Sequence, residues 1–472
     1  MPNEKINELP KIKEFKMKTT IPVHKNEELT ATITDITYQG MGVAKVDGYP
    51  LFVAGALPGE EVKLHVLKAD KKYGFAKAIK YLTTSPDRVD GGKKELVQTG
   101  IAPLQHWAYP AQLRYKKKLV SDLLQKAHLS DLQVTETVGM DKPRHYRNKA
   151  QVPTRNYKGQ LTTGFFRRGS HNFIPLEDYE IQDPRIDEVI LTVRDILREY
   201  NVPAYNEEKH TGVIRNVMVR RGHYSGEVMV VLITRTKKLK GAAEISAKIQ
   251  ELCPDVISVQ QNINPDKTNV ILGKTTKIMR GRNYIQDQLN GLTFNISAQS
   301  FYQVNPEQTE KLYARAVELA DLHGEETVID AYCGIGTISL SLAKAAKEVY
   351  GVEIVPEAIE DAKENARINK LDNLTFEVGN AEEKMQHWAN AGVDPDVIVV
   401  DPPRKGLTAN FIEAAAKTAP QKVVYVSCNP ATLVRDIERF GEQGYSVKRP
   451  LEPFDQFPQT THVETIAVLE RN

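Results

Sequence analysis

The stretch VVYVSCNP, residues 423–430, decides how the C-terminal part of the chain folds. Its β-branched and aromatic run predicts a buried parallel strand ending at Cys428, and the Asn-Pro pair that follows predicts the start of a helix. Open α/β sheets bind ligands at this C-terminal edge of their strands. Because the positive end of the next helix favours a thiolate, Cys428 is a candidate nucleophile. The alternative interpretation is a buried core cysteine.

The composition is that of a globular protein in a reducing compartment. The 472 residues are 41% hydrophobic and 26% charged, with a formal net charge of +2, and this length corresponds to about three domains. Three cysteines provide no disulfide framework. The chain has no apolar run of about 18 residues, and its N-terminus lacks the apolar core of a signal peptide. We expect a cytoplasmic monomer without a membrane partner.

The N-terminal residues divide into a tail and a small barrel. Residues 1–22 are polar and Lys-rich, which predicts a flexible tail. Residues 23–85 alternate over five short segments separated by turn residues, which predicts an OB-type β-barrel. Such barrels bind RNA through basic and aromatic side chains. The candidates here are Lys68, Lys71, Lys72, Tyr73 and Phe75, although a solvated hairpin tip would carry the same residues.

Residues 86–300 are expected to form a central α+β domain that includes a helical linker over about 110–128. The linker helix carries Arg114 and the run Lys116–Lys118, and such charge runs are usually solvated helix faces. In the domain itself, Arg147 and Lys149 are candidates for contact with RNA phosphates.

Residues 301–472 alternate strongly between strands and helices, and two final runs, 446–451 and 462–469, can pair as an antiparallel hairpin. This pattern predicts an α/β, Rossmann-like sheet with a terminal hairpin. The first strand leads into a Gly334-x-Gly336 turn, and Glu353 ends the next strand, the spacing of an acid that binds ribose hydroxyls. A third glycine for a pyrophosphate is missing, so S-adenosylmethionine is the ligand that we expect.

The sequence DPPR, residues 401–404, closes the fourth strand. Prolines can simply terminate a strand. They can also stiffen a loop at the sheet edge and direct Asp401 into the same cleft as Cys428. Methyltransferases that act on amino groups tend to end this loop with an aromatic residue, whereas this chain has Arg404. That difference favours methylation at carbon, which needs a covalent nucleophile.

Six segments together resemble one known family; in chain order they are Ile36–Ala44, Ser300–Asn305, Asp330–Thr337, Asp401–Arg404, Ser427–Pro430 and Thr461–Glu464. They are similar to the RNA (uracil-C5)-methyltransferases of the 23S rRNA type, whose N-terminal barrel is a TRAM domain. The resemblance implies a class I methyltransferase that makes 5-methyluridine in 23S rRNA. By the same resemblance, Cys428 adds to carbon 6 of uracil and Glu464 removes the proton of carbon 5.

The resemblance also implies the binding residues. The cofactor contacts map to Gln303, Tyr332, Gly334, Thr337, Glu353, Asn380 and Asp401. Asn380 stands where the family usually has Asp. Asp401 is expected beside both cofactor and base, and Phe301 or Tyr302 is expected to stack on the target uracil.

One departure concerns an iron-sulfur cluster that many relatives bind through four cysteines. The aligned positions here are Lys93, Thr99, Ala102 and Tyr179. Cluster ligation requires thiolates, so we predict no cluster. Cys253 is then structural, and Cys333 shapes the cofactor turn.

Other classes remain as alternatives. Related enzymes methylate uridine in tRNA by the same chemistry but are expected to lack the barrel, so the barrel favours rRNA. A non-catalytic RNA-binding module would not need Cys428, Asp401 and Glu464. RNA cytosine-C5 methyltransferases usually have a second cysteine beside the Asp-Pro loop, where this chain has prolines.

Overall fold

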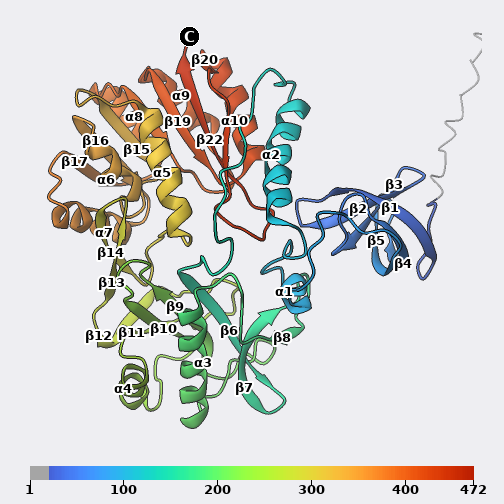
Figure 1. The fold of residues 1–472 in the computed structure, drawn as a ribbon. Coiled ribbons are helices and arrows are strands. Elements are labelled where there is room, and N and C mark those ends of the chain that lie inside the picture. The colour runs from blue at the N-terminus through green and yellow to red at the C-terminus, as the bar shows by residue number, and fades with distance from the viewer. Residues whose placement is uncertain (1–20) are drawn as a thin grey trace, which may run out of the picture. The chain divides into compact units, whose positions relative to one another are not determined.

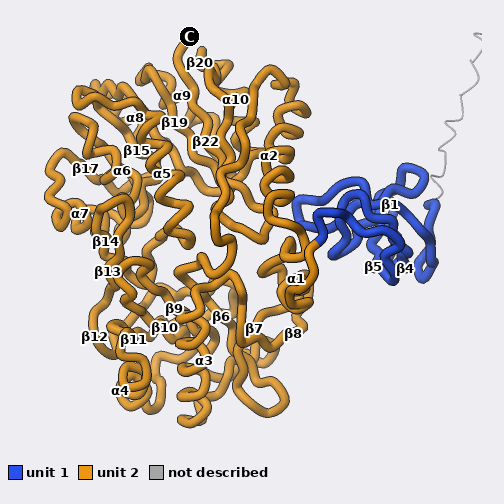
Figure 2. The backbone as a smooth tube through the Cα atoms, viewed as in Figure 1, with its two compact units in different colours: residues 1–88 blue, residues 89–472 orange. Residues whose placement is uncertain are grey.

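The computed structural model describes residues 21–472 of the chain and contains two compact units, residues 1–88 and 89–472 (Figure 2). The predicted tail over residues 1–22 lies outside the described residues except for its last two positions. The proposed division of the second unit at residue 300 stays a prediction.

The first unit is a closed five-stranded barrel, as the sequence predicts. Its strand order is β1-β2-β3-β5-β4, with a parallel pairing between β3 and β5. Alternate residues point inward and form a core that includes Leu51, Val53 and Leu64. The strands are β1 (Glu28–Ile36), β2 (Met41–Val46), β3 (Tyr49–Ala54), β4 (Glu61–Ala69) and β5 (Gly74–Tyr81).

The central part of the second unit is built on a seven-stranded mixed sheet in the order β12-β11-β10-β9-β6-β7-β8. Its inner strand β10 is buried along its whole length, which explains its unbroken apolar sequence. Helices α3 (Pro184–Glu199) and α4 (Ala242–Leu252) pack on one face. The strands are β6 (Lys149–Tyr157), β7 (Gln160–Phe166), β8 (Phe173–Pro175), β9 (Ile214–Arg221), β10 (Val228–Thr234), β11 (Val256–Ile263) and β12 (Thr275–Gly281).

The C-terminal sheet has eight strands, and seven of them follow the order β17-β16-β15-β18-β19-β22-β20. Strands β15 to β19 are parallel, whereas β22 runs antiparallel between β19 and β20, so the predicted terminal hairpin is confirmed. The strands are β15 (Thr327–Ala331), β16 (Glu348–Glu353), β17 (Leu374–Val378), β18 (Val397–Val400), β19 (Lys422–Ser427), β20 (Tyr445–Val447), β21 (Glu452–Phe454), which pairs only with β22, and β22 (Glu464–Arg471).

Helices cover both faces of this sheet (Figure 1). Strand β19 explains why: Val424 and Val426 belong to one core, and Val423 and Tyr425 belong to the other. One core holds α5 (Pro306–Ala320), α6 (Thr337–Ala343) and α7 (Pro356–Ile368). The other holds α2 (Tyr109–Lys126), α8 (Ala381–Ala391), α9 (Ala409–Lys417) and α10 (Pro430–Glu442).

The central and C-terminal sheets share a hydrophobic core. Met218 and Val231 of the central sheet belong to the same cluster as Val328 and Val424 of the C-terminal sheet. The hairpin β13 (Tyr284–Leu289) and β14 (Leu292–Ser297) contributes to the same cluster. The packing of the second unit is therefore continuous across residue 300.

Helix α2 corrects one expectation from the sequence. Its basic run was expected to be a solvated face, and Arg114 and Lys118 are indeed exposed. Lys116, however, is completely buried in an ion pair with Asp455, which follows β21. Helix α1 (Lys94–Thr99) precedes α2. No helix of residues 21–472 is long and apolar enough to cross a membrane.

Candidate active site

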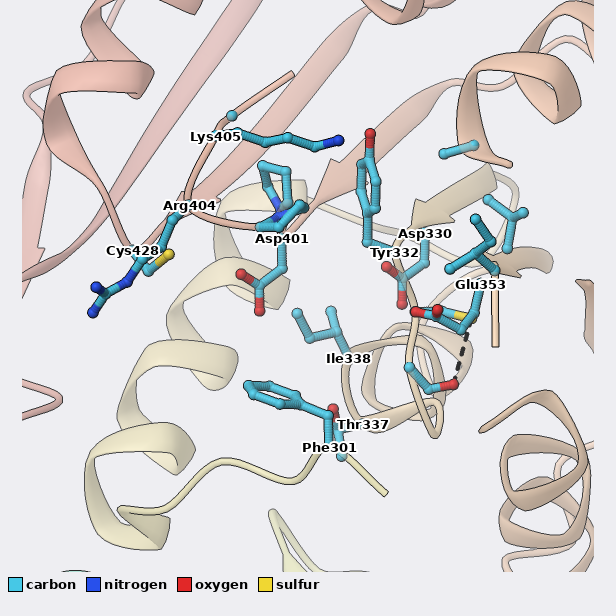
Figure 3. Close-up of a pocket in the computed structure, with 18 of the residues that line it drawn as sticks. Phe301, Asp330, Tyr332, Thr337, Ile338, Glu353, Asp401, Arg404, Lys405 and Cys428 are labelled. Atoms are coloured by element: carbon cyan, nitrogen blue, oxygen red, sulfur yellow. Dashed lines mark hydrogen bonds between the residues drawn. The ribbon is translucent and has the colours of Figure 1, made fainter. Parts of the chain in front are cut away.

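A cavity of about 590 Å³ lies at the C-terminal edge of the parallel strands and collects most of the predicted site residues. Cys428, Asp401, Glu464 and Phe301 line it, and Figure 3 shows Cys428, Asp401 and Phe301 around one space. The predicted cofactor residues line it too: Gln303, Tyr332, Gly334, Thr337, Glu353, Asn380 and Asp401. The cavity thus brings together segments that are more than 100 residues apart in the sequence.

Cys428 stands directly after β19, and Asn429 caps the helix that follows by accepting a hydrogen bond from Ala431 N. The position at the strand end is the predicted one. The predicted ionisation is wrong, because burial, followed by the charges of Glu464 and Asp401, raises the pKa of the Cys428 thiol to about 12. The helix end does not compensate for these effects, and the thiol holds its proton at neutral pH.

Two carboxyl groups face this cysteine. Asp401 follows β18, and Glu464 is the first residue of β22 and is 3% exposed. Burial raises the pKa of both carboxyls, and the charge of Asp401 raises the pKa of Glu464 further. Both groups are therefore stronger bases than ordinary carboxylates, a property typical of groups that transfer protons.

Arg404 is a cation at the mouth of the same cavity. Its Nη2 donates a hydrogen bond to Nδ1 of His462 at 3.3 Å. Burial, together with the charge of Arg404, lowers the pKa of His462 to about 4, so the imidazole is neutral and can accept this bond. The Phe457 ring stands 6.0 Å from that of His462 and lines the cavity beside it.

The glycine-rich turn between β15 and α6 forms the opposite wall. Gly334 and Gly336 have φ values of 54° and 83°, and Gly336 is the N-cap of α6. Tyr332 adopts φ 72° without being glycine, a strained conformation that is common at ligand sites. The backbone of this turn is therefore open to close approach by a ligand.

Acidic and amide side chains complete this wall. Asp330 is fully buried; Ser339 donates to its Oδ2, while its Oδ1 has no hydrogen-bond partner. Burial raises its pKa to about 7. Glu353 accepts a bond from Val355 N with one oxygen, and Asn380 caps α8 by accepting from Glu382 N. Unused oxygens beside an open backbone fit a ligand with hydroxyl and amino groups.

Three predicted substrate residues lie elsewhere. Tyr302 is 3% exposed and packs in the core near Phe294, so the expectation that it could stack on a base is wrong. Phe301 is 65% exposed and is the aromatic residue that remains for this role. Arg147 and Lys149 do not line the cavity; Lys149 lies on β6 of the central sheet.

The structure adds cavity residues that the sequence did not single out, namely Tyr313, Ile338 and Phe457. They belong to segments without a chemical motif, so no sequence signal pointed to them. His462 was noted only as part of the Thr461–Glu464 segment. The other two cysteines, Cys253 and Cys333, are buried, and burial raises the pKa of both thiols; their roles stay predictions.

The positions aligned with cluster ligands have other contacts. Lys93 forms an ion pair with Asp178, and Ala102 and Tyr179 belong to the core around Leu96. Among residues 21–472 there is no group of three or more His, Cys, Asp or Glu side chains arranged to hold a metal. The absence of a cluster stays a prediction.

The doubly wound sheet with its terminal antiparallel strand and its cavity at the glycine-rich turn defines the protein as a class I methyltransferase. Comparison with known families agrees. Residues 108–472 match the tRNA (Uracil-5-)-methyltransferase family, and residues 22–79 match the TRAM domain. The chain belongs to this family of S-adenosylmethionine-dependent RNA uracil-5-methyltransferases and carries an N-terminal TRAM domain.

Individual relatives support the assignment. An uncharacterized RNA methyltransferase of Lactiplantibacillus plantarum is 56% identical over 96% of this chain and 100% of its own length. One of Enterococcus faecalis is 50% identical over 95% of this chain and 98% of its own. The crystal structure of Pyrococcus abyssi tRNA (uracil-54, C5)-methyltransferase in complex with S-adenosyl-L-homocysteine matches with a TM-score of 0.74, 26% identity and coverage of 93% of this chain and 99% of that one.

The last match corrects an argument from the sequence. Coverage of 93% of this chain cannot be reached without residues of the barrel. An enzyme named for tRNA therefore shares the N-terminal region, and the expectation that tRNA enzymes lack the barrel is wrong. The barrel indicates RNA binding and does not distinguish the two RNAs.

Proposed function

We propose that the protein methylates carbon 5 of a uridine in 23S rRNA through a covalent adduct with Cys428. The observation that carries the proposal is the cavity in which Cys428, Asp401 and Glu464 meet next to the glycine-rich turn. A nucleophile, a base and a cofactor wall are the three parts that methylation of an unreactive ring carbon needs. The choice of 23S rRNA rests on the order of the six segments that resemble enzymes of that type.

The glycine-rich wall is the proposed binding place of S-adenosylmethionine. The open backbone at Gly334, the acidic Glu353 and the unpartnered oxygen of Asp330 match its hydroxyl and amino groups. Gln303 and Thr337 reach the same wall from other elements. When bound, S-adenosylmethionine supplies a methyl group on a sulfonium sulfur as the electrophile.

The remaining chemistry belongs to the protein. Carbon 5 of uracil is a weak nucleophile, so the sulfur of Cys428 adds to carbon 6 and leaves carbon 5 enolate-like. After carbon 5 is methylated, Glu464 takes its proton. The double bond between carbons 5 and 6 then forms again, the carbon-sulfur bond breaks, and Cys428 leaves as a thiolate.

Ionisation of Cys428 needs a base of its own. Burial and the neighbouring carboxylates raise its pKa, so the thiol must lose its proton as uracil enters. Glu464 has to stay unprotonated for the later step. Asp401, whose pKa burial also raises, is the proposed acceptor of the thiol proton and returns it when Cys428 is released.

The base must be presented to the cavity. A uracil inside a duplex cannot reach Cys428, whereas a loop nucleotide can be turned out at low cost. The exposed ring of Phe301 is placed to stack on such a base.

The test is transfer of labelled methyl from S-adenosylmethionine to unmodified 23S rRNA and, separately, to unmodified tRNA, followed by nucleoside analysis and site mapping. We expect label in 5-methyluridine of 23S rRNA. The second candidate is tRNA, which the Pyrococcus abyssi neighbour favours, and label in tRNA alone would establish it. Label in neither RNA would contradict the proposed reaction.

A further inference from the structure

Two basic side chains stand opposite each other in the central sheet. Lys149 of β6 pairs with Arg220 of β9, and these strands are antiparallel neighbours (Figure 1). Residues in direct register point to the same face of a sheet, about 5 Å apart at their Cβ atoms. Arg220 is 2% exposed, whereas Lys149 is only partly buried. The pair therefore joins a buried guanidinium to an ammonium that solvent can reach.

In the part of the chain that the structure describes, no carboxylate lies within ion-pair distance of either member of this pair. Among residues 21–472 neither Lys149 nor Arg220 takes part in an ion pair; Arg220 Nη2 donates to Ser300 O at 2.8 Å, and its buried Nε has no hydrogen-bond partner. Asp361 and Tyr302 interact with Arg220 electrostatically, but Asp361 already accepts hydrogen bonds from Ser297 and Ser300.

Two other buried basic and acidic groups of the chain do have ion-pair partners. Lys116 is paired with Asp455, and buried Glu60 is paired with Arg88. Leaving like charges together without a partner is unfavourable in a protein interior. Burial first, and then the charges of Arg220 and Arg147, lower the pKa of Lys149 to about 7. Burial likewise lowers the pKa of Arg220 to about 10.

The location connects the pair to the active site. The Ser300 carbonyl that holds Arg220 precedes Phe301, which lines the cavity. The Asn148 side chain, next to Lys149 on the chain, donates to the carbonyl of Gln303, another cavity residue. An anion bound by the pair would thus lie beside the segment that receives the target base.

We propose that Lys149 forms a phosphate site that holds a backbone phosphodiester of the RNA next to the target uridine, with buried Arg220 adding its positive charge from behind. The inference rests on the proposed RNA substrate and adds the group that anchors it. The phosphate supplies the negative charge that no ion-pair partner among the described residues provides to Lys149 and Arg220. Arg147, which also acts electrostatically on Lys149, adds to the positive field.

The experiment replaces Lys149 by Met, which keeps the length of the side chain and removes the charge. Binding of a fluorescent single-stranded RNA oligonucleotide that contains uridine is measured against salt concentration. We expect weaker binding and a slope of log Kobs against log salt that is shallower by about 0.7, the value for one phosphate on a single strand. Lys149→Arg should retain the slope.

Thermal unfolding without RNA separates this role from a structural one. Loss of a structural lysine would lower Tm, whereas removal of an uncompensated charge should raise the Tm of Lys149→Met. The matched control is Lys248→Met on α4, which breaks an ion pair with Glu199. It should leave the salt slope unchanged and should not raise Tm.

RNA affinity measured over a series of pH values tests the phosphate site independently. A bound phosphate favours protonated Lys149, so RNA binding takes up a proton once the pH exceeds about 7. Affinity should fall as pH rises above that value in the wild type, and this part of the dependence should be absent in Lys149→Met. The titrations of Asp401 and Glu464 are common to the wild type and to Lys149→Met, so their effect on affinity cancels when the two proteins are compared.

An unchanged salt slope in Lys149→Met, or a lowered Tm, overturns the phosphate site. Wild-type protein that shows the expected slopes but transfers no methyl would leave the phosphate site standing and remove the proposed reaction. If the wild-type protein methylates RNA normally while Lys149→Met binds RNA with an unchanged salt slope, the phosphate site is removed and the proposed reaction stands.

Discussion

At the scale of single residues, the cavity holds Cys428, the proposed nucleophile, in the protonated form. Burial, followed by the charges of Glu464 and Asp401, raises the pKa of Cys428. The same burial makes the carboxyls of Asp401 and Glu464 better bases. Reactivity at Cys428 therefore depends on its neighbours more than on the helix that follows it.

Replacement of Cys428 by Ala should lower methyl transfer by about three orders of magnitude or more, because the proposed adduct forms through its sulfur. Binding of S-adenosylmethionine, measured by titration calorimetry, should persist. Cys253→Ala is the matched control, since Cys253 is buried away from the cavity and should leave turnover intact. Substantial turnover by Cys428→Ala would remove this residue from its role.

Replacement of Glu464 by Gln should permit attack and methylation but block loss of the carbon-5 proton. A protein-RNA adduct that survives denaturation should then accumulate and migrate as a larger species in a denaturing gel. Turnover at the wild-type rate without an adduct would show that the base is another residue.

The rate should depend on pH with a positive sign. Cys428 and Glu464 act in their deprotonated forms, and burial raises the pKa of both, so the initial rate should rise from acidic to alkaline pH. Arg404 opposes these shifts. Arg404→Gln should therefore shift the midpoint of the pH-rate profile to higher pH by about one unit. Lys405→Gln, on the same loop, should shift it less. An unmoved profile in Arg404→Gln would contradict this electrostatic role.

At the scale of elements, helix α2 fixes the segment that precedes Glu464, the proposed base. Lys116 pairs with Asp455 in complete burial, and Gln112 donates to Gln459 from the same helix. The segment between β21 and β22 also receives a hydrogen bond from Tyr146 at the carbonyl of Pro458. These contacts hold residues 455–463, and Glu464 follows directly.

Lys116→Met should lower the free energy of unfolding by about 3–5 kcal/mol, because Asp455 is left as a buried charge without a partner. Chemical denaturation measures the loss, and the double variant Lys116→Met/Asp455→Leu should recover most of it. Lys117→Met breaks a surface ion pair with Glu136 on the same helix and should cost at most about 1 kcal/mol. Equal losses for the two single variants would contradict the special role of the buried pair.

The elements show where pattern reasoning succeeds. The strands that flank the cavity are continuous apolar runs, so their existence and parallel arrangement could be predicted from composition and spacing alone. The position of α2 could not. Its periodicity indicates an amphipathic helix, but nothing local shows that Lys116 finds a carboxylate more than 300 residues away.

At the scale of the whole molecule, the chain combines a barrel unit with a catalytic unit, and each has its own core. In the barrel, the rings of Phe52, Tyr73 and Phe75 lie 5.5–5.8 Å apart, and Tyr73 is exposed. Exposed aromatic rings are stacking platforms for bases. We therefore expect the barrel to add affinity for RNA and the cavity to carry out the proposed reaction.

Tyr73→Ala should weaken RNA binding by about 1–3 kcal/mol, the contribution of one stacked base. In steady-state kinetics KM for RNA should rise, with kcat and the affinity for S-adenosylmethionine unchanged. A fall in kcat at unchanged KM would contradict the division of labour between the two units.

The sequence by itself determined the local parts of this protein: the barrel strands, the βα alternation, the glycine-rich turn, and Cys428 at a strand end. These depend on periodicity and turn chemistry, which act over a few residues. Only the tertiary structure decided which side chains share an environment. It buried Tyr302, exposed Phe301, raised the pKa of Cys428 and put Lys149 opposite Arg220 with neither of them in an ion pair among the described residues. The physical reason is that burial and charge depend on distant segments, whose positions no local pattern encodes.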